Sequence, residues 1–382
     1  MPDAVVIGGG LAGSSLAIRL AHLGWKTLLL DRQSFPRHKA CGEFLSPETQ
    51  GMFKELGVYE RLEALNPGRI VNTRIVFRHG GLVEAKLDEP AWGLSRYAMD
   101  AAMLKAAEDA GVYVQTGRSV SSIVSEPGGF RIGTRSGGAS EVLHSRTVYA
   151  AWGAHPRAGL LAKTPVVNGK GRRAYIGLKA HFSGMHLEQS VELYFIRGGY
   201  VGISHVENGL ANVAALLPLD WARGKGSSVS DLLVSAASEN RLLYDRLTGG
   251  SPLPETQVST APVYLSAKCN AWSIIPQVGD ACAMIPPLFG DGMSAALRSA
   301  SRCAIYGDRF LRGAITMDAW KKDYCSDMHQ EYAAILRWGH LLQTLGNMPV
   351  VPRLWTAGTR LFPQLARCMV QATRLNGKTP MP

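Results

Sequence analysis

The sequence predicts an α/β protein with a Rossmann-like nucleotide-binding domain, an antiparallel β-sheet domain and a helical C-terminal region. Three patterns support this prediction. At the N-terminus, an apolar strand pattern is followed by a glycine-rich turn and a helical pattern. Residues 174–216 alternate between apolar and polar, as antiparallel strands do. Helical periodicity then runs through Met293–Leu311 and Met317–Leu345.

The N-terminal unit is a compact strand–helix–strand pattern. Ala4–Ile7 and Thr27–Leu30 are short apolar runs, and Leu11–Leu23 between them has helical spacing. Because the β-rich middle of the chain lies between two α/β ends, we expect the nucleotide-binding domain to be discontinuous. It is predicted to comprise residues 1–70, 91–165 and 265–315, with the sheet domain at 71–90 and 166–264 and the helical region at 316–382.

Composition narrows the classes of protein that fit. Of the 382 residues, 46% are apolar and 19% charged, which favours a large core over long disordered tails. The net charge of +11 favours acidic partners such as phosphates, anionic substrates or a membrane surface. No zinc-finger spacing or basic zipper is present, so no nucleic-acid partner is expected. The six cysteines include no C-x-x-C pair, which argues against a metal site and for a cytoplasmic location.

The glycine turn after the first strand fits G-x-G-x-x-G. Gly8 allows the tight turn, Gly10 lets a pyrophosphate approach the backbone, and Gly13 lets the helix pack on the strand. Asp31 ends the second strand, at the distance where an acid binds ribose hydroxyls. The complete unit predicts a bound dinucleotide but does not separate NAD from FAD.

Three further motifs separate them. The first is Pro36–Glu43, which reads P-R-H-K-A-C-G-E, and the second is Arg96 followed by Asp100. The third is the Gly-Asp pair ending at Asp280, followed by Pro286, Gly290, Gly292 and Met293. With the glycine turn, these motifs resemble the FAD-dependent superfamily of aromatic hydroxylases, geranylgeranyl reductases and flavin halogenases. The resemblance covers nearly the whole chain and is nearest to the geranylgeranyl reductase branch.

The resemblance implies an FAD domain of the glutathione-reductase type and assigns roles to the motifs. Arg96 is expected near the FAD diphosphate, Asp280 at the ribityl chain, and the Pro36–Glu43 loop close to the flavin. The helix that begins after Gly292 is expected to stabilise negative charge on the reduced flavin. The predicted cofactor-binding residues are Gly8, Gly10, Ala12, Gly13, Asp31, Arg32, Arg37, Lys39, Ala40, Cys41, Gly42, Arg96, Asp280, Pro286, Gly290, Gly292 and Met293.

One segment departs from the family pattern. Where the family has an A-D-G-x-x-S type motif, this chain has Trp152 in place of the acidic residue. That motif supports reductant binding in the family, and only one dinucleotide fold is visible here. Two electron donors therefore stay open: NAD(P)H visiting transiently, or a flavin reductase or other donor protein.

The sequence also leaves two reactions of the reduced flavin open. A hydride can pass to an activated C=C bond, or reaction with oxygen can give a C4a-peroxyflavin that hydroxylates or epoxidises the substrate. The segment from Gly292 to Ala300 is closer to the reductase branch, which makes reduction the first hypothesis and monooxygenation the alternative. The lysine and the W-x-W-x-I-P motif of the halogenases are not found, and Trp272–Pro276 resembles that motif only superficially and in the wrong place in the chain. A flavin electron-transfer protein is the hypothesis from a different class.

Cys41, Glu43 and Tyr200 are the candidate catalytic residues. Cys41 is read either as a substrate gate or proton donor, or as a small residue in a crowded loop. Glu43 is read as a base or as an acid that orders the loop. Tyr200 resembles the aromatic of the reductases' G-Y-x-W segment, in which Gly202 here replaces the tryptophan and enlarges the cavity. An apolar substrate of isoprenoid, polyketide or aromatic type is expected.

The C-terminal tail is basic and contains no acidic residue after Glu331. Four arginines recur every seven residues among apolar ones, at 353, 360, 367 and 374. Such a stripe suits a helix lying on anionic lipid or docking an acidic carrier domain. It also suits an ordinary amphipathic helix that closes the substrate domain. The first interpretation implies a lipid-like or carrier-bound substrate and peripheral contact with a membrane.

Overall fold

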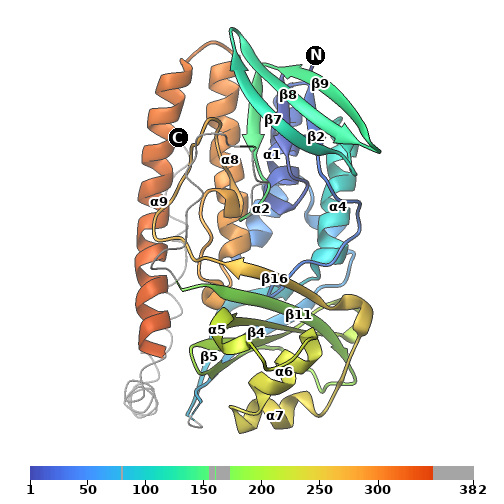
Figure 1. The fold of residues 1–382 in the computed structure, drawn as a ribbon, viewed down its shortest axis with the longest axis vertical. Coiled ribbons are helices and arrows are strands. Elements are labelled where there is room, and N and C mark those ends of the chain that lie inside the picture. Colours follow the sequence, from blue (N-terminus) through green and yellow to red (C-terminus); the bar gives the residue numbers. More distant parts are fainter. Residues whose placement is uncertain (79–80, 155–159, 161–172, 347–382) are drawn as a thin grey trace.

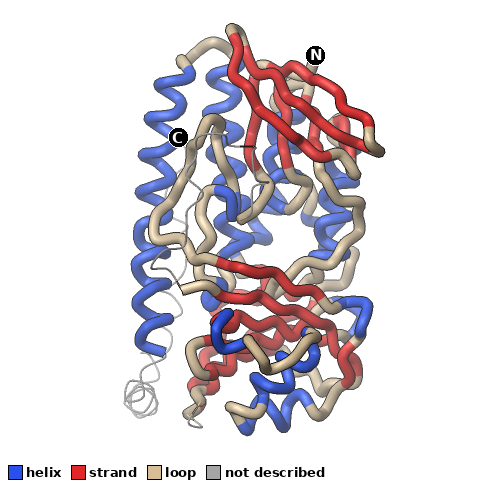
Figure 2. Tube along the Cα trace, viewed as in Figure 1, coloured by secondary structure: helices blue, strands red, loops and turns tan. Residues whose placement is uncertain are grey.

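A computed structural model of the chain describes residues 1–78, 81–154, 160 and 173–346, and it divides into an upper α/β part and a lower sheet (Figure 1). Helices α1 (Leu11–His22), α4 (Arg96–Asp109) and α8 (Gly292–Leu311) belong to the upper part. Figure 2 shows the strands of the lower part gathered beneath them. Within the described residues no helix combines the length and the apolar character needed to cross a bilayer.

The upper part contains a four-stranded parallel sheet in the order β10-β1-β2-β6. Every residue of the three strands β10, β1 and β2 is buried. Ala4 and Val6 pack on the helical side, whereas Val5 and Ile7 pack against a second, three-stranded sheet. Burial on both faces explains the continuous apolar runs in the sequence. The strands are β1 (Ala4–Ile7), β2 (Thr27–Leu30), β6 (Tyr113–Gln115), β10 (Thr147–Ala150), β7 (Ser119–Glu126), β8 (Gly129–Ser136) and β9 (Ala139–Ser145).

The lower part is a nine-stranded sheet in the order β15-β11-β14-β13-β12-β4-β5-β3, with β16 also pairing with β11. All of its pairs are antiparallel except β12 with β4, so the sheet is mixed rather than purely antiparallel as predicted. The strands are β3 (Phe44–Leu45), β4 (Gly68–Val76), β5 (Leu82–Gly93), β11 (Tyr175–Ser183), β12 (Ser190–Ile196), β13 (Gly199–His205), β14 (Ala211–Pro218), β15 (Ser251–Pro252) and β16 (Val258–Val263).

The alternation along β11 shows how this sheet positions the site. Leu178, Ala180 and Phe182 pack in a core with the outer helices α6 (Val229–Ala237) and α7 (Arg241–Leu247). Lys179 and His181 lie on the opposite face, which is turned toward the upper part. These two helices are separate because the side chain of Asn240 caps the start of the second one. The short helices α2 (Glu48–Leu56), α3 (Tyr59–Glu63) and α5 (Leu219–Ala222) complete the α-helices of the described residues before α8.

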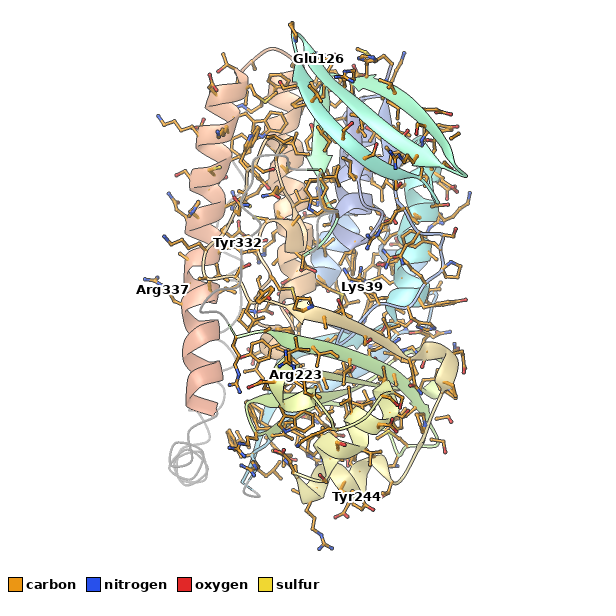
Figure 3. All side chains as sticks on the ribbon, viewed as in Figure 1. Lys39, Glu126, Arg223, Tyr244, Tyr332 and Arg337 are labelled. Atoms are coloured by element: carbon orange, nitrogen blue, oxygen red, sulfur yellow. The ribbon has the colours of Figure 1, made fainter. Side chains whose placement is uncertain are left out.

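The C-terminal helix α9 (Met317–Gly346) lies along α8. Tyr324 and Tyr332 are buried and donate hydrogen bonds to the carbonyls of Gln277 and Ala295. Figure 3 labels Tyr332 on the inner side of α9 and Arg337 on its outer side. This helix therefore packs against the upper α/β part, and the four tail arginines lie beyond the described residues.

Candidate functional site

The turn between β1 and α1 has no room for side chains at two of the three glycines of its G-x-G-x-x-G motif. Gly8 has a φ of +114°, and a Cβ there would lie 2.3 Å from the carbonyl oxygen of Ala151. A Cβ on Gly13 would lie 1.8 Å from the carbonyl oxygen of Gly8. At Gly10 the nearest atom would be the flexible end of Arg96, at 3.3 Å. The turn thus leaves open backbone at the positive N-terminus of α1, which suits a pyrophosphate.

Asp31 orders this turn from the end of β2. Its carboxylate accepts hydrogen bonds from the amides of Gly9 (2.7 Å) and Gln33 (2.8 Å). Arg37 Nη2 lies 3.8 Å from Asp31, and burial lowers the pKa of Arg37. The Nε of Arg37 is buried and has no partner within the described residues, so it is available to a ligand oxygen. Arg32 is exposed, and its contact with the cofactor stays a prediction.

Three charged side chains from distant segments meet beyond the turn. Arg96 forms a two-pronged ion pair with Asp100, with both N–O distances at 2.8 Å. Burial lowers the pKa of Arg96, but Asp100 outweighs it and raises that pKa, so the guanidinium stays charged. Lys39 Nζ lies 3.8 Å from Asp280, and burial followed by the charge of Arg96 lowers the pKa of Lys39. Two cations and an aspartate suit a ligand carrying both phosphates and hydroxyls.

These groups line a cavity of about 280 Å³ at the junction of the two parts of the molecule. Figure 3 labels Lys39 there, between the upper helices and the lower strands. Predicted cofactor residues in its wall are Gly10, Ala12, Lys39, Ala40, Cys41, Gly42, Arg96, Asp280, Gly290, Gly292 and Met293. Predicted residues outside its wall are Gly8, Gly13, Asp31, Arg32, Arg37 and Pro286, although Pro287 does line it. The sheet supplies an apolar wall that includes Ile75, Leu87, Val191, Leu193, Leu216 and Val263.

The three candidate catalytic residues also line this cavity. Tyr200 on β13 is buried and belongs to the cavity wall. Burial, and then the nearby Cys41, raise the pKa of Tyr200, so the phenol keeps its proton. Cys41 Sγ accepts a hydrogen bond from the amide of Glu43 at 3.4 Å. The cavity wall thus contains a thiol and a protonated phenol.

Glu43 differs from the other two because its carboxylate is fully engaged. It accepts hydrogen bonds from the amide of Arg96 (2.9 Å) and from His181 Nε2 (2.7 Å), and Lys179 Nζ lies 3.1 Å away. The residue has no exposed surface. Of the two interpretations of Glu43, a base or a loop-ordering acid, this geometry favours the second.

Sequence reasoning missed Lys179 and His181. Both are buried on the face of β11 that packs against the loop from His38 to Glu43, and His38 completes the group through a 3.0 Å contact between its Nδ1 and Lys179 Nζ. The signal was present in the sequence, because Lys179 and His181 stand two positions apart in an otherwise apolar strand. Such spacing places both side chains on one face of a sheet.

The two tryptophans singled out in the sequence both pack rather than line the cavity. Trp152 is half-buried against the core between the parallel sheet and β7–β9. Trp272 meets Trp320 edge-to-face, with 5.2 Å between ring centroids. These contacts give each ring a packing role.

Comparisons with known proteins identify the family of this chain. The family described as FAD binding domain matches residues 1–199. An FAD-dependent monooxygenase, OpS4, of Beauveria bassiana is 32% identical, but the match covers only 31% of this chain and 30% of that protein. The 1H-pyrrole-2-carbonyl-[peptidyl-carrier protein] chlorinase of Pseudomonas fluorescens is 22% identical over 88% of this chain and 80% of the relative. The menaquinone reductase of Mycobacterium tuberculosis is 25% identical over 79% of this chain and 75% of the relative.

Solved structures show the same fold. The myxobacterial chondrochloren halogenase CndH superposes with a TM-score of 0.80 at 20% identity, covering 99% of this chain and 91% of that one. A halogenase PltM variant in complex with FAD superposes with a TM-score of 0.76 at 14% identity, covering 99% and 84%. The open glycine turn, the unpartnered Arg37 nitrogen and the charged cavity wall all fit FAD. The chain therefore belongs to the FAD binding domain family and is an FAD-dependent enzyme of the oxidoreductase superfamily that includes monooxygenases.

Proposed function

We propose that this enzyme reduces an activated C=C bond in an apolar substrate of isoprenoid, polyketide or aromatic type. The proposal rests on the distribution of charged and apolar residues in the cavity wall. Its charged lining residues gather on the side of the FAD-binding motifs, while the sheet opposite is largely aliphatic. An uncharged, apolar substrate is the kind of molecule that such a wall binds.

Bound and reduced, FAD supplies a hydride. The aliphatic wall binds the substrate and excludes water. The proposed role of the Tyr200 hydroxyl, which keeps its proton in the cavity wall, is to donate a hydrogen bond to an oxygen conjugated with the double bond. The thiol of Cys41 is the candidate proton source for the carbon that does not receive the hydride. The proposed role of Glu43 is to order the loop that carries Cys41.

The match to the mycobacterial menaquinone reductase supports the reductive proposal, because it extends over 79% of this chain. The second candidate is monooxygenation of an aromatic or polyketide-like substrate, which the similarity to the FAD-dependent monooxygenase OpS4 favours. Several relatives and solved structures are halogenases, so halogenation is a third outcome for the same assay. Against it, Lys39 is the one lysine among the described residues of the cavity wall, and it pairs with Asp280.

NAD(P)H visiting transiently is the proposed electron donor, with a separate flavin reductase or other donor protein as the alternative. Anaerobic mixing of the FAD-loaded enzyme with NADPH or NADH tests this proposal. Bleaching of the flavin absorbance within seconds supports direct reduction, whereas unchanged absorbance with both nucleotides requires a protein donor.

One experiment tests the reaction type independently of the donor. The FAD-loaded enzyme is reduced with one equivalent of dithionite without oxygen and mixed with an apolar conjugated enone. We expect stoichiometric flavin reoxidation and a product that has gained two hydrogens across its C=C bond. A product that forms only with oxygen and contains ¹⁸O from ¹⁸O₂ would replace the proposal with monooxygenation, and dependence on bromide or chloride would replace it with halogenation.

A further inference from the structure

Behind the loop that carries Cys41 lies a buried ion pair that the proposed chemistry does not use. Lys179 has no exposed surface, and its Nζ lies 3.1 Å from Glu43 Oε1 and 3.0 Å from His38 Nδ1. His181 occupies the other carboxylate oxygen of Glu43 at 2.7 Å. Of these side chains only that of His38 is half-buried, and its ring stacks on the exposed ring of Tyr97. Lysine is seldom fully buried unless it is paired, because burying its charge is costly.

The sheet holds three successive residues of the loop. The carbonyl of Cys41 accepts a hydrogen bond from Asn212 Nδ2 at 3.0 Å, and the carbonyl of Gly42 accepts one from Ser204 Oγ at 2.9 Å. The carboxylate of Glu43 then pairs with Lys179. These partners lie on three neighbouring strands, β14, β13 and β11. The lower sheet thus holds the loop at each residue from Cys41 to Glu43.

The backbone of Glu43 shows that the loop does not hold this shape by itself. Glu43 has a φ of +53°, in the left-handed region that residues other than glycine seldom adopt. A residue stays there when its surroundings over-determine its position. The carboxylate contacts of Glu43 are part of those surroundings: they are fully buried and charge-assisted, and charge-assisted hydrogen bonds are stronger than neutral ones.

The same carboxylate connects the sheet to the cofactor site. Glu43 Oε1 contacts Lys179 Nζ and also accepts the amide hydrogen bond of Arg96. Arg96 is the first residue of α4, and its guanidinium reaches the glycine turn of α1. A change in the position of Lys179 would therefore alter the contacts of both the loop and Arg96 at the cofactor site.

We propose that Lys179 is a positioning residue: through its ion pair with Glu43 it holds the loop against the lower sheet and fixes the Cys41 thiol in the cavity wall. The proposal rests on the proposed function only in taking this cavity as the reaction site. A purely structural lysine would stabilise the fold without controlling the exposure of the thiol. The two roles are distinguishable because the reactivity of Cys41 can be measured apart from stability.

The experiment measures the alkylation rate of Cys41 by iodoacetamide in the FAD-loaded protein, with each cysteine followed by peptide mass spectrometry. Lys179→Met removes the pair and leaves Glu43 charged. Glu43→Gln with Lys179→Met removes the pair and leaves no orphan charge. Lys225→Met is the matched control, because Lys225 pairs with Glu239 at 3.4 Å on the opposite side of the sheet. Cys325 on α9 is the internal reference.

We expect Lys179→Met to raise the Cys41 rate by about tenfold, as suits the loss of a charge-assisted contact. The double variant should be more stable than Lys179→Met but keep the raised alkylation rate of Cys41. The Cys41 rate in Lys225→Met, and the Cys325 rate in every variant, should equal those of the wild type. A wild-type alkylation rate of Cys41 in the folded double variant would overturn the proposal. If Lys179→Met does not fold, the double variant is sufficient for the test. Because alkylation needs no substrate, the outcome is separate from that of the anaerobic product assay.

Discussion

The glycine turn of α1 gives the sharpest test, because two of its glycines, Gly13 and Gly10, should respond differently to one added methyl group. At Gly13 the new Cβ would lie 1.8 Å from the carbonyl oxygen of Gly8. Ordinary contact needs about 3.5 Å, so α1 would have to move away from β1 by roughly 1.5 Å. Overpacking in a tight core typically costs about 1–3 kcal/mol, and a clash with a backbone atom belongs at the upper end of that range. Gly13→Ala should therefore lose stability and FAD binding together.

At Gly10 the new Cβ would meet only Arg96 Nη2, at 3.3 Å, and a flexible side chain can move. Gly10→Ala should fold normally yet bind FAD about 10- to 100-fold more weakly, which corresponds to roughly 1.4–2.8 kcal/mol. The control is Gly51→Ala in α2, where a Cβ would meet nothing within 4 Å. That change should stabilise the protein by about 0.5–1 kcal/mol, because glycine is a poor helix former.

Two measurements check the series: urea unfolding of the FAD-free proteins, and FAD titration followed by quenching of flavin fluorescence. The expected order is a loss of both properties at Gly13, a loss of affinity alone at Gly10, and neither loss at Gly51. A Gly13→Ala variant with wild-type unfolding and wild-type affinity would refute the steric account of this turn. Equal effects at Gly13 and Gly10 would refute its distinction between packing and ligand approach.

Three further predictions follow from the site and the tail. Tyr200→Phe should keep FAD affinity and lower kcat by about 10- to 100-fold, since one preorganised donor is lost; an unchanged kcat would remove Tyr200 from the chemistry. Burial, and then Lys179, lower the pKa of His38 below its ordinary 6.5. As the pH falls through about 6.5, His38 therefore binds a proton more readily in the unfolded chain than in the folded protein, and the free energy of unfolding should decline. In urea unfolding experiments, the His38→Gln variant should show a smaller decline than the wild type. Deleting residues 350–382 should abolish binding to anionic liposomes if the arginine stripe contacts lipid, and unchanged binding would contradict that interpretation.

The cofactor half could be predicted from the sequence because its requirements are local. Gly8 and Gly13 stand where the backbone permits no side chain, and this demand is visible in a few consecutive residues. The convergence of Arg96 with Asp280 is different, because nothing in their spacing brings them together. It was expected only from the family resemblance.

The substrate half was predicted less completely, for a physical reason. Alternation in β11 indicates that Lys179 and His181 share a face, but it does not say what covers that face. The loop from His38 to Glu43 covers it, and its sequence distance from β11 hides the contact. The parallel pairing of β12 with β4 was missed for the same reason, since periodicity along one strand does not identify its neighbour.

The distribution of charge in the cavity restricts the substrate further. The lysine, arginine and aspartate of the described wall, Lys39, Arg96 and Asp280, pair with one another or with Asp100 at the cofactor side. A charged group placed against the aliphatic wall would find no counter-ion there, and burying it unpaired would be unfavourable. The reacting end of the substrate should therefore be neutral, and any phosphate or carrier attached to it should remain outside the cavity. An uncharged quinone should then compete for the site with the natural substrate, whereas its carboxylated analogue of similar size should not.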